Sequence, residues 1–270
     1  ECYFCNIKFK HLKVVLFTPP FTQLNTPYPA TSYIKGFLNT LQIDAFQCDL
    51  GLEVILEVFC KSGLEDIFQI IEDGEIELSD LAYRVFTQRY KYIKTIDAVI
   101  HFLQNKNQTL ALTICAGGYL PEGSRFAQVE QLDWAFGTMG THDKARHLAT
   151  LYLEDLGDLI TEAIDNHFGF SRYAERLGRT ATHFDDMYKA LLSENSYISN
   201  VLLGLVDRCI TTQNPDVVCI TAPFPGNVFG AFKCGQYIKT NFPKIKVVFG
   251  GGYANTELRS VYDERVFEFV

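Results

Sequence analysis

The chain has 270 residues, of which 47% are hydrophobic and 14% aromatic, and its formal net charge is −8. This length is sufficient for a large buried core in one or two domains. The acidic balance argues against nonspecific nucleic-acid binding, which depends on contacts of Lys and Arg with phosphate. Because no apolar run of about 18 residues is present, a membrane span is not expected either.

The amino-terminal end lacks the basic segment and long apolar segment of a signal peptide, so we expect a cytoplasmic protein. The chain begins at Glu1 and not at Met, and we expect it to be part of a longer protein. Several of its eight cysteines, such as Cys219, lie in apolar runs, which favours small buried residues in a reducing cytosol over a disulfide framework. The Cys2–Cys5 pair has no second pair at zinc spacing, so no metal site is predicted.

Both ends of the chain predict alternating strands and helices. Residues 12–51 indicate strand, loop, helix and strand, and residues 200–253 indicate helix, strand, helix and strand. The expected strands are 13–17, 45–48, 216–220 and 247–249, and the expected helices between them are 30–41 and 230–240. This alternation is typical of a parallel sheet.

The middle of the chain differs, because helical periodicity with acidic and aromatic faces predominates there. The expected helices are 53–60, 64–71, 78–104, 125–136, 148–167 and 182–194, and the one strand candidate is 110–114. We therefore predict an α/β protein, a Rossmann-like (flavodoxin-like) three-layer sandwich with a mostly parallel sheet. Residues 1–51 and 200–270 form this discontinuous domain, and residues 52–199 form a large helical insertion.

Each predicted strand ends in a segment that suits a ligand-binding loop. The four segments are Thr18-Pro19-Pro20-Phe21, Asp49-Leu50-Gly51, Thr221-Ala222-Pro223-Phe224 and Gly250-Gly251-Gly252. In open α/β sheets, ligands bind outside the carboxyl ends of the strands, so the four segments together predict one broad site. Taken singly, each is equally compatible with a stiff surface loop or an ordinary turn.

Other chemistries lack their sequence patterns. There is no phosphate-binding Gly-x-x-x-x-Gly-Lys-Ser/Thr loop, no Gly-x-Gly-x-x-Gly after the first strand and no Gly-x-Ser-x-Gly elbow. The histidines in the middle of the chain are isolated or separated by a turn, so we interpret them as surface or core residues and not as metal ligands.

The strand-end segments resemble the cobalamin (B12)-binding domain at the amino terminus of B12-dependent radical SAM proteins. The resemblance rests on Pro-Pro-Phe-Thr at 19–22, Pro-Tyr-Pro-Ala-Thr at 27–31, Asp49-Leu50-Gly51, Thr221-Ala222-Pro223-Phe224 and Phe249-Gly250-Gly251-Gly252-Tyr253. It covers roughly residues 12–51 and 214–270 and does not explain the central insertion.

The resemblance implies cobalamin as the cofactor. The residues implied to line its site are Pro20, Phe21, Thr22, Tyr28, Thr31, Asp49, Leu50, Gly51, Thr221, Ala222, Pro223, Phe224, Gly250, Gly251, Gly252 and Tyr253. Thr221 would donate a hydrogen bond to the nucleotide tail, the glycines would admit that tail against backbone, and Phe21 and Tyr28 would pack near the corrin. In the wider cobalamin-binding fold, a loop after the first strand supplies a histidine to cobalt. Residues 19–29 contain no histidine, which implies a base-off, His-off form.

The resemblance also implies a catalytic partner domain. Radical SAM enzymes hold a [4Fe–4S] cluster with Cys-x-x-x-Cys-x-x-Cys, which this sequence does not contain. The cluster and S-adenosylmethionine are therefore expected only in a radical SAM domain that follows Val270 in the same protein. This chain alone is expected not to be catalytic, and the parent enzyme is expected to transfer a methyl group or to catalyse a related rearrangement. Three alternatives remain, namely a small-ligand sensor, a protein-interaction module, and a relative that has lost cobalamin.

Overall fold

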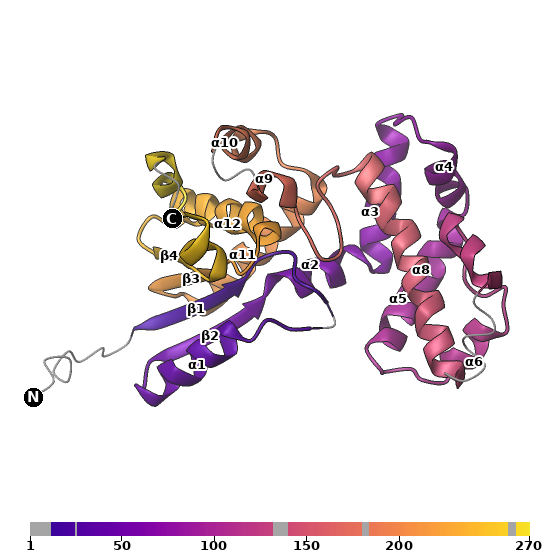
Figure 1. Cartoon of the computed structure of the whole chain (residues 1–270), viewed down its shortest axis with the longest axis horizontal. Helices are drawn as coiled ribbons and strands as arrows, with labels where there is room; N and C mark the ends of the chain where they lie inside the picture. Colours follow the sequence, from indigo (N-terminus) through magenta and orange to yellow (C-terminus); the bar gives the residue numbers. More distant parts are fainter. Residues whose placement is uncertain (1–11, 25, 132–139, 180–183, 259–262) are drawn as a thin grey trace, which may run out of the picture. The chain divides into compact units, whose positions relative to one another are not determined.

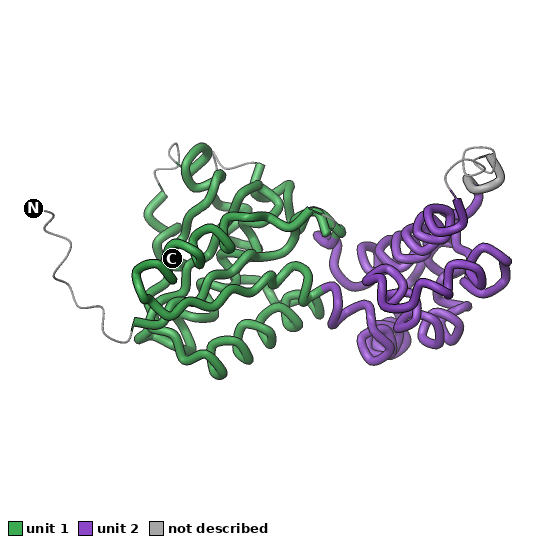
Figure 2. Tube along the Cα trace, turned by 90° about the horizontal axis from the view of Figure 1, so that it is seen from below, with its two compact units in different colours: residues 1–54, 169–270 green, residues 55–168 purple. Residues whose placement is uncertain are grey.

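The structure is a computed structural model, and it divides the chain into two compact units. The sheet unit comprises residues 1–54 and 169–270, and the helical unit comprises residues 55–168 (Figure 2). The residues whose structure is described are 12–24, 26–131, 140–179, 184–258 and 263–270. Within these ranges, no helix is both long and apolar enough to cross a membrane.

The sheet unit is built on four parallel strands in the order β2-β1-β3-β4. The strands are β1 (Lys13–Thr18), β2 (Asp44–Asp49), β3 (Val217–Thr221) and β4 (Lys246–Gly250). In the central strand β1, Val15 lies opposite Phe46 of β2 and Val218 of β3. The predicted parallel sheet is confirmed, and each predicted strand lies within one residue of an observed one.

The sheet is covered by helices on both sides, as Figure 1 shows. Helix α1 (Ala30–Thr40) lies on one side, and α11 (Tyr197–Gln213) and α12 (Val228–Asn241) lie on the other. Right-handed crossovers produce this arrangement, because the chain runs outward from β1 to β2 and then in the opposite direction from β3 to β4. The predicted Rossmann-like three-layer sandwich is therefore confirmed.

The two helical layers differ in how deeply they are buried. Helix α12 buries most of its length against the sheet unit, whereas α1 leaves Tyr33 and Phe37 largely exposed. The shorter elements of this unit are α9 (Glu175–Arg179), α10 (Asp185–Leu192), η3 (Pro225–Asn227), α13 (Gly252–Thr256) and η5 (Glu264–Glu268).

The helical unit packs around one long helix, α8 (Gly140–Ala163). The other helices are α3 (Lys61–Asp73), α4 (Asp80–Thr87), α5 (Arg89–Leu103), α6 (Leu110–Cys115) and η2 (Ser124–Gln131), and α2 (Leu50–Val58) crosses the boundary between the units. In the core, the rings of Tyr92 and Tyr152 stack with centroids 4.9 Å apart. The Tyr152 hydroxyl donates a hydrogen bond to the Tyr92 carbonyl oxygen at 3.0 Å.

Three sequence-based expectations for the middle of the chain need correction. The strand expected at 110–114 is wrong, because these residues form α6, in which Ala111 and Ile114 are buried at helical spacing. The single helix expected at 78–104 is two helices, which meet at Gln88. The helix expected at 125–136 is a 3-10 helix over Ser124–Gln131, and residues 132–136 lie outside the described ranges.

The insertion also ends earlier than expected, at residue 168 and not at 199. The described residues between 169 and 199 belong to the sheet unit because they pack on its core. The Tyr173 ring lies between Phe21 and Phe229, with centroids 5.7 Å and 5.3 Å away. Gly178 lies so close to the backbone of Pro225 that a side chain there would collide with it.

Candidate functional site

The candidate site lies at the carboxyl edge of the sheet, where the loops after β1 and β3 leave in opposite directions. Such a reversal of strand order opens a crevice, the usual ligand site of open α/β sheets. A cavity of about 390 Å³, here called the edge cavity, lies between these two loops. Its lining is formed by Thr22, Gln23, Thr26, Pro27, Tyr28, Pro29, Ser171, Arg172, Glu175, Phe224, Pro225 and Gly226.

The walls of the edge cavity combine aromatic rings with an ion pair. The rings of Tyr28 and Phe224 meet edge to face with centroids 6.0 Å apart, and Phe224 is 55% exposed. Arg172 Nη1 lies 3.0 Å from Glu175 Oε2, and Arg179 Nη2 lies 3.0 Å from the other oxygen of that carboxylate. Cavities of this size, with apolar walls and a few polar groups, are typical of sites for small organic ligands.

Phe21 secures the loop after β1 and does not line the edge cavity. Its ring is 1% exposed and packs on Tyr173. The backbone N–H groups of Phe21 and Tyr173 both donate to the carbonyl oxygen of Gly226, at 3.3 Å and 3.0 Å. The loops after β1 and β3 and the 171–175 segment are thereby joined through one carbonyl group.

Asn227, the last residue of η3, also connects the loops after β1 and β3. Its side chain is fully buried, and Nδ2 donates to the Pro19 carbonyl oxygen at 2.9 Å. That bond fixes the orientation of the amide, because Pro19 O can only accept. Asn227 Oδ1 faces inward and receives no hydrogen bond within the described part of the chain.

The ends of β3 and β4 are connected by backbone hydrogen bonds. Ala222 N donates to Gly250 O at 2.8 Å, and Tyr253 N donates to Ala222 O at 3.1 Å. The Thr221 side chain is 7% exposed, and its hydroxyl forms no hydrogen bond with any described residue. Thr221 thus places a hydroxyl without a hydrogen bond to the described residues at the carboxyl end of β3, in a residue that is largely buried.

The three glycines after β4 have different surroundings. A Cβ on Gly251 would lie 2.6 Å from Ala222 O, and a Cβ on Gly252 would lie 3.0 Å from Pro223 O. A Cβ on Gly250 would meet nothing within 4 Å. The backbone after β3 thus fills the space beside two of the glycines, and open space remains only beside Gly250.

The segment after β2 packs against the loop after β1. Asp49 Oδ1 accepts a hydrogen bond from Leu52 N at 3.0 Å, which satisfies a free donor in the first turn of α2. Leu50 is fully buried, and a Cβ on Gly51 would lie 3.5 Å from Pro20 Cα. These three residues therefore have structural roles at the same edge.

Two further predicted residues are buried near the edge. Thr31 is the buried residue of α1, in its first turn. The Tyr253 hydroxyl donates to the Gly178 carbonyl oxygen at 2.8 Å, and burial raises the pKa of Tyr253 to about 12. Both side chains face the interior of the sheet unit.

The structure thus sorts the predicted site residues into three groups. Thr22, Tyr28 and Phe224 line the edge cavity. Pro20, Phe21, Thr31, Asp49, Leu50 and Gly51 support the loops beside it. Thr221, Ala222, Pro223, Gly250, Gly251, Gly252 and Tyr253 form the connected ends of β3 and β4.

Sequence reasoning missed Arg172, Glu175 and Asn227. The first two lie in a stretch that was assigned to the helical insertion. Asn227 follows a Pro-Gly turn just before a helix, a position where Asn commonly caps, and this was the available signal. In the described residues, no group of three His, Cys, Asp or Glu side chains is arranged to hold a metal ion, and Cys2 and Cys5 lie outside them.

No family model, curated protein or solved structure matches this chain.

Proposed function

We propose that the sheet unit binds cobalamin in a base-off, His-off form, as the cofactor-binding part of a B12-dependent radical SAM enzyme. One observation carries the proposal: the Thr221 hydroxyl, which forms no hydrogen bond with a described residue, and the open space beside Gly250 occur at adjacent strand ends. Both lie on the sheet edge that also holds the aromatic walls of the edge cavity. A ligand with a polar tail and a broad ring system suits this combination.

The residues at this edge fit the group in specific ways. Thr221 supplies a hydrogen-bonding group, and Gly250 allows close approach to backbone. Gly251 and Gly252 act indirectly, because their contacts with Ala222 and Pro223 hold the turn that sets the position of Gly250. Tyr28 and Phe224 offer apolar rings, and Phe224 is well exposed.

When bound, cobalamin supplies alkyl transfer at its cobalt, and the protein supplies binding, orientation and exclusion of water. The loop after β1 contains no histidine, so no imidazole from this loop competes for the cobalt. Thr221 and Gly250 would hold the tail, and the loops after β1 and β3 would limit how the ring system lies.

The first test is a titration of the chain with hydroxocobalamin, followed by desalting and a visible spectrum. We expect roughly stoichiometric retention with a base-off spectrum. Gly250→Val fills the open space and should abolish retention without unfolding the protein, since nothing lies within 4 Å of the new Cβ. Lys246→Val is the matched control, because it adds the same side chain at the exposed amino end of the same strand and should retain the corrinoid.

The Thr221→Val variant tests corrinoid binding with little effect on the stability of the protein. The change replaces a hydroxyl that has no hydrogen bond to a described residue with a methyl group, so the free energy of unfolding should change by less than about 1 kcal/mol. Retention of the corrinoid should fall about fivefold or more, which corresponds to one lost hydrogen bond. Unchanged retention in both Gly250→Val and Thr221→Val, or no retention by the folded parent chain, would refute the proposal for this chain.

The volume of the edge cavity favours a second candidate, a sensor for a small organic ligand. At about 390 Å³ it lies at the lower end of the range for such sites. In a sensor, Phe224→Ala would abolish ligand binding, whereas Gly250→Val would leave it unchanged because Gly250 does not line the cavity. The two variants together distinguish the candidates.

A further inference from the structure

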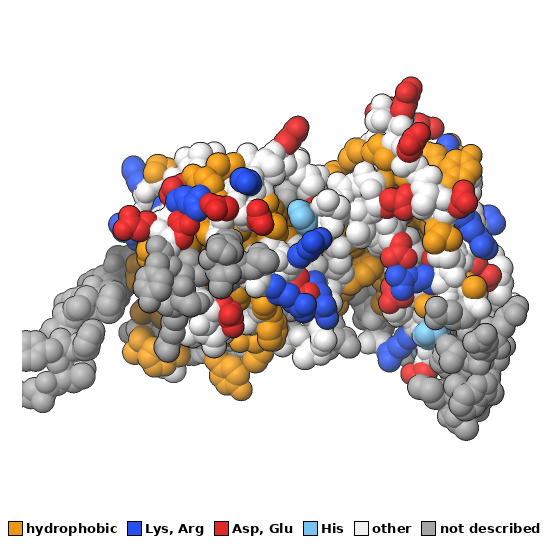
Figure 3. Space-filling view, turned by 45° about the horizontal axis from the view of Figure 1, so that its top comes forward, with side chains coloured by type: hydrophobic (Ala, Val, Ile, Leu, Met, Phe, Trp, Pro, Cys, Tyr) orange, Lys and Arg blue, Asp and Glu red, His pale blue; other side chains and the backbone are white. Residues whose placement is uncertain are grey.

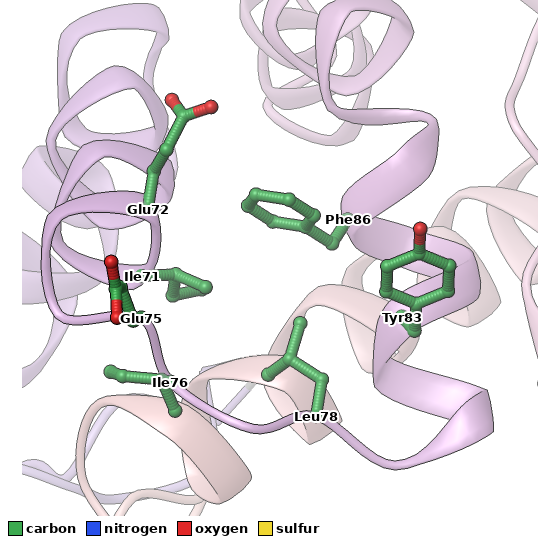
Figure 4. Close-up of a pocket in the computed structure, with 7 residues that line it drawn as sticks. All are labelled: Ile71, Glu72, Glu75, Ile76, Leu78, Tyr83 and Phe86. Atoms are coloured by element: carbon green, nitrogen blue, oxygen red, sulfur yellow. The ribbon is translucent and has the colours of Figure 1, made fainter.

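The helical unit contains its own cavity, which the sheet-edge site does not involve. It has a volume of about 350 Å³ and lies where the end of α3, the segment 74–79 and α4 meet, and we call it the α3–α4 cavity. Ile71, Ile76 and Leu78 form an apolar floor. Figure 4 shows Glu72 and Glu75 on the α3 side and the rings of Phe86 and Tyr83 on the α4 side. The cavity is thus apolar at its base and acidic along one wall.

The two carboxylates differ in their partners. Glu72 Oε1 lies 3.5 Å from Arg89 Nη2, and the same guanidinium group lies 4.7 Å from the centre of the Phe86 ring. The Glu75 backbone N–H donates to Glu72 O at 3.3 Å, but its carboxylate makes no hydrogen bond or ion pair with any residue that the structure describes. Arg89 therefore pairs with Glu72, and the Glu75 carboxylate remains open to a ligand.

The backbone holds Glu75 in an unusual conformation. Its φ is +45°, in the left-handed region that favours glycine, and it follows directly on Gly74 at the end of α3. The carboxyl terminus of α3 lies at the same place and carries partial negative charge, although the carbonyl groups of Ile70, Ile71 and Glu72 already accept backbone hydrogen bonds. The Glu75 carboxylate and the carboxyl end of α3 are both negative, so both attract a cation.

The charge distribution of the chain strengthens this preference. The helical unit has 9 Lys and Arg against 18 Asp and Glu, a formal charge of −9, whereas the whole chain has −8. Residues 57–80 alone contain eight acidic residues and one basic residue. Figure 3 shows acidic side chains beside apolar ones on the surface of this unit. A field of this sign concentrates cations near the cavity.

We propose that the α3–α4 cavity binds a primary alkylammonium ion. Its ammonium group pairs with the Glu75 carboxylate beside the carboxyl terminus of α3, and its aliphatic body lies on Ile76 and Leu78 beside the ring of Tyr83. The apolar floor and the Tyr83 ring favour an apolar body, and the open carboxylate favours a single positive charge at its end. A metal cation does not suit this cavity, because hard cations prefer several oxygen ligands and hold their water.

The test is a methyl NMR titration of the full chain with n-butylammonium chloride. We expect saturable shifts of the Ile71, Ile76 and Leu78 methyl signals, with a dissociation constant on the order of 1 mM. Uncharged n-butanol should bind at least about fivefold more weakly, since it lacks the ion pair. Binding of the cation should weaken as sodium chloride is raised, because salt screens exposed charges.

Three variants complete the test. Glu75→Gln and Glu75→Gly should each weaken binding about fivefold or more. Glu75→Gly should also fold at least as well as the parent, because glycine is the favoured residue at this φ. The control, Glu77→Gln, removes one charge from the same segment but not from the cavity lining, and binding should change less than twofold. The proposal is overturned by absent or non-saturating shifts, by equal binding of butanol, or by equal effects of Glu75→Gln and Glu77→Gln.

Discussion

Replacing Gly251 with alanine tests how the end of β4 is built. Gly251 has φ +107° and ψ −179°, a region that residues with a Cβ rarely adopt. The added Cβ would lie 2.6 Å from Ala222 O and 2.8 Å from Ala222 N, so backbone would have to move. The conformation costs about 1–3 kcal/mol and the overpacking about 1–3 kcal/mol, and we expect a loss of about 4 kcal/mol in the free energy of unfolding of the sheet unit.

Gly250→Ala is the control for this prediction. Its Cβ meets nothing within 4 Å, and Gly250 does not have a positive φ. The variant should match the parent within about 1 kcal/mol, with a small gain from the reduced entropy of the unfolded chain.

Urea denaturation monitored by hydrogen exchange and mass spectrometry is the suitable assay, because it reports separately on peptides from the two units. Gly251→Ala should accelerate exchange in β3 and β4 and leave α5 and α8 in the helical unit unchanged. Equal stabilities of Gly251→Ala and Gly250→Ala would show that the close approach to Ala222 is not what requires a glycine here.

Two further predictions concern buried ionisable groups. Tyr253→Phe removes the hydrogen bond to Gly178. Burial raises the pKa of Tyr253 from 10 to about 12, so the stability that the protonated hydroxyl contributes is present below pH 10 and is lost as the pH rises through 12. The parent should therefore lose up to about 2.7 kcal/mol relative to the variant over that range, measured by urea denaturation at several pH values. Asp155→Ala leaves the N–H groups of Gly123 and Arg125 without an acceptor and should destabilise the helical unit by about 2 kcal/mol. Burial raises the pKa of Asp155 above its ordinary 3.8, so the parent should lose stability relative to Asp155→Asn as pH rises from below 3.8 through the folded pKa; a flat difference would contradict this.

The sheet could be predicted from sequence because buried parallel strands are continuous apolar runs with sharp ends. Residues 13–17 and 216–220 are such runs, bounded by Pro, Asp or Thr. Residues 110–114 are also apolar, but such a short run fits a strand or a buried helix equally well, and periodicity does not separate the two. The structure makes this segment a helix that packs on α8.

The candidate site was predictable only in part, for a related reason. Carboxyl ends of parallel strands share one edge, so Thr221 and Gly250 could be placed together from their positions after two strands. Arg172 reaches the edge cavity through the packing of its neighbour Tyr173 between two rings, which leaves no local pattern in the sequence. The burial of Phe21 depends on the same packing, so it could not be predicted from the local sequence either.

The pairing of β1 with β3 has a consequence for how the protein is made. Lys13 N and Asp216 Oδ2 are 2.9 Å apart in space and 203 residues apart in sequence. At about 5–20 residues per second, a ribosome needs about 10–40 s to add that length. During this time β1 can pair with β2, but its other edge has no partner, and an unpaired apolar edge invites aggregation. Strand β1 therefore gains its second neighbouring strand, β3, only after the entire helical unit has been synthesised.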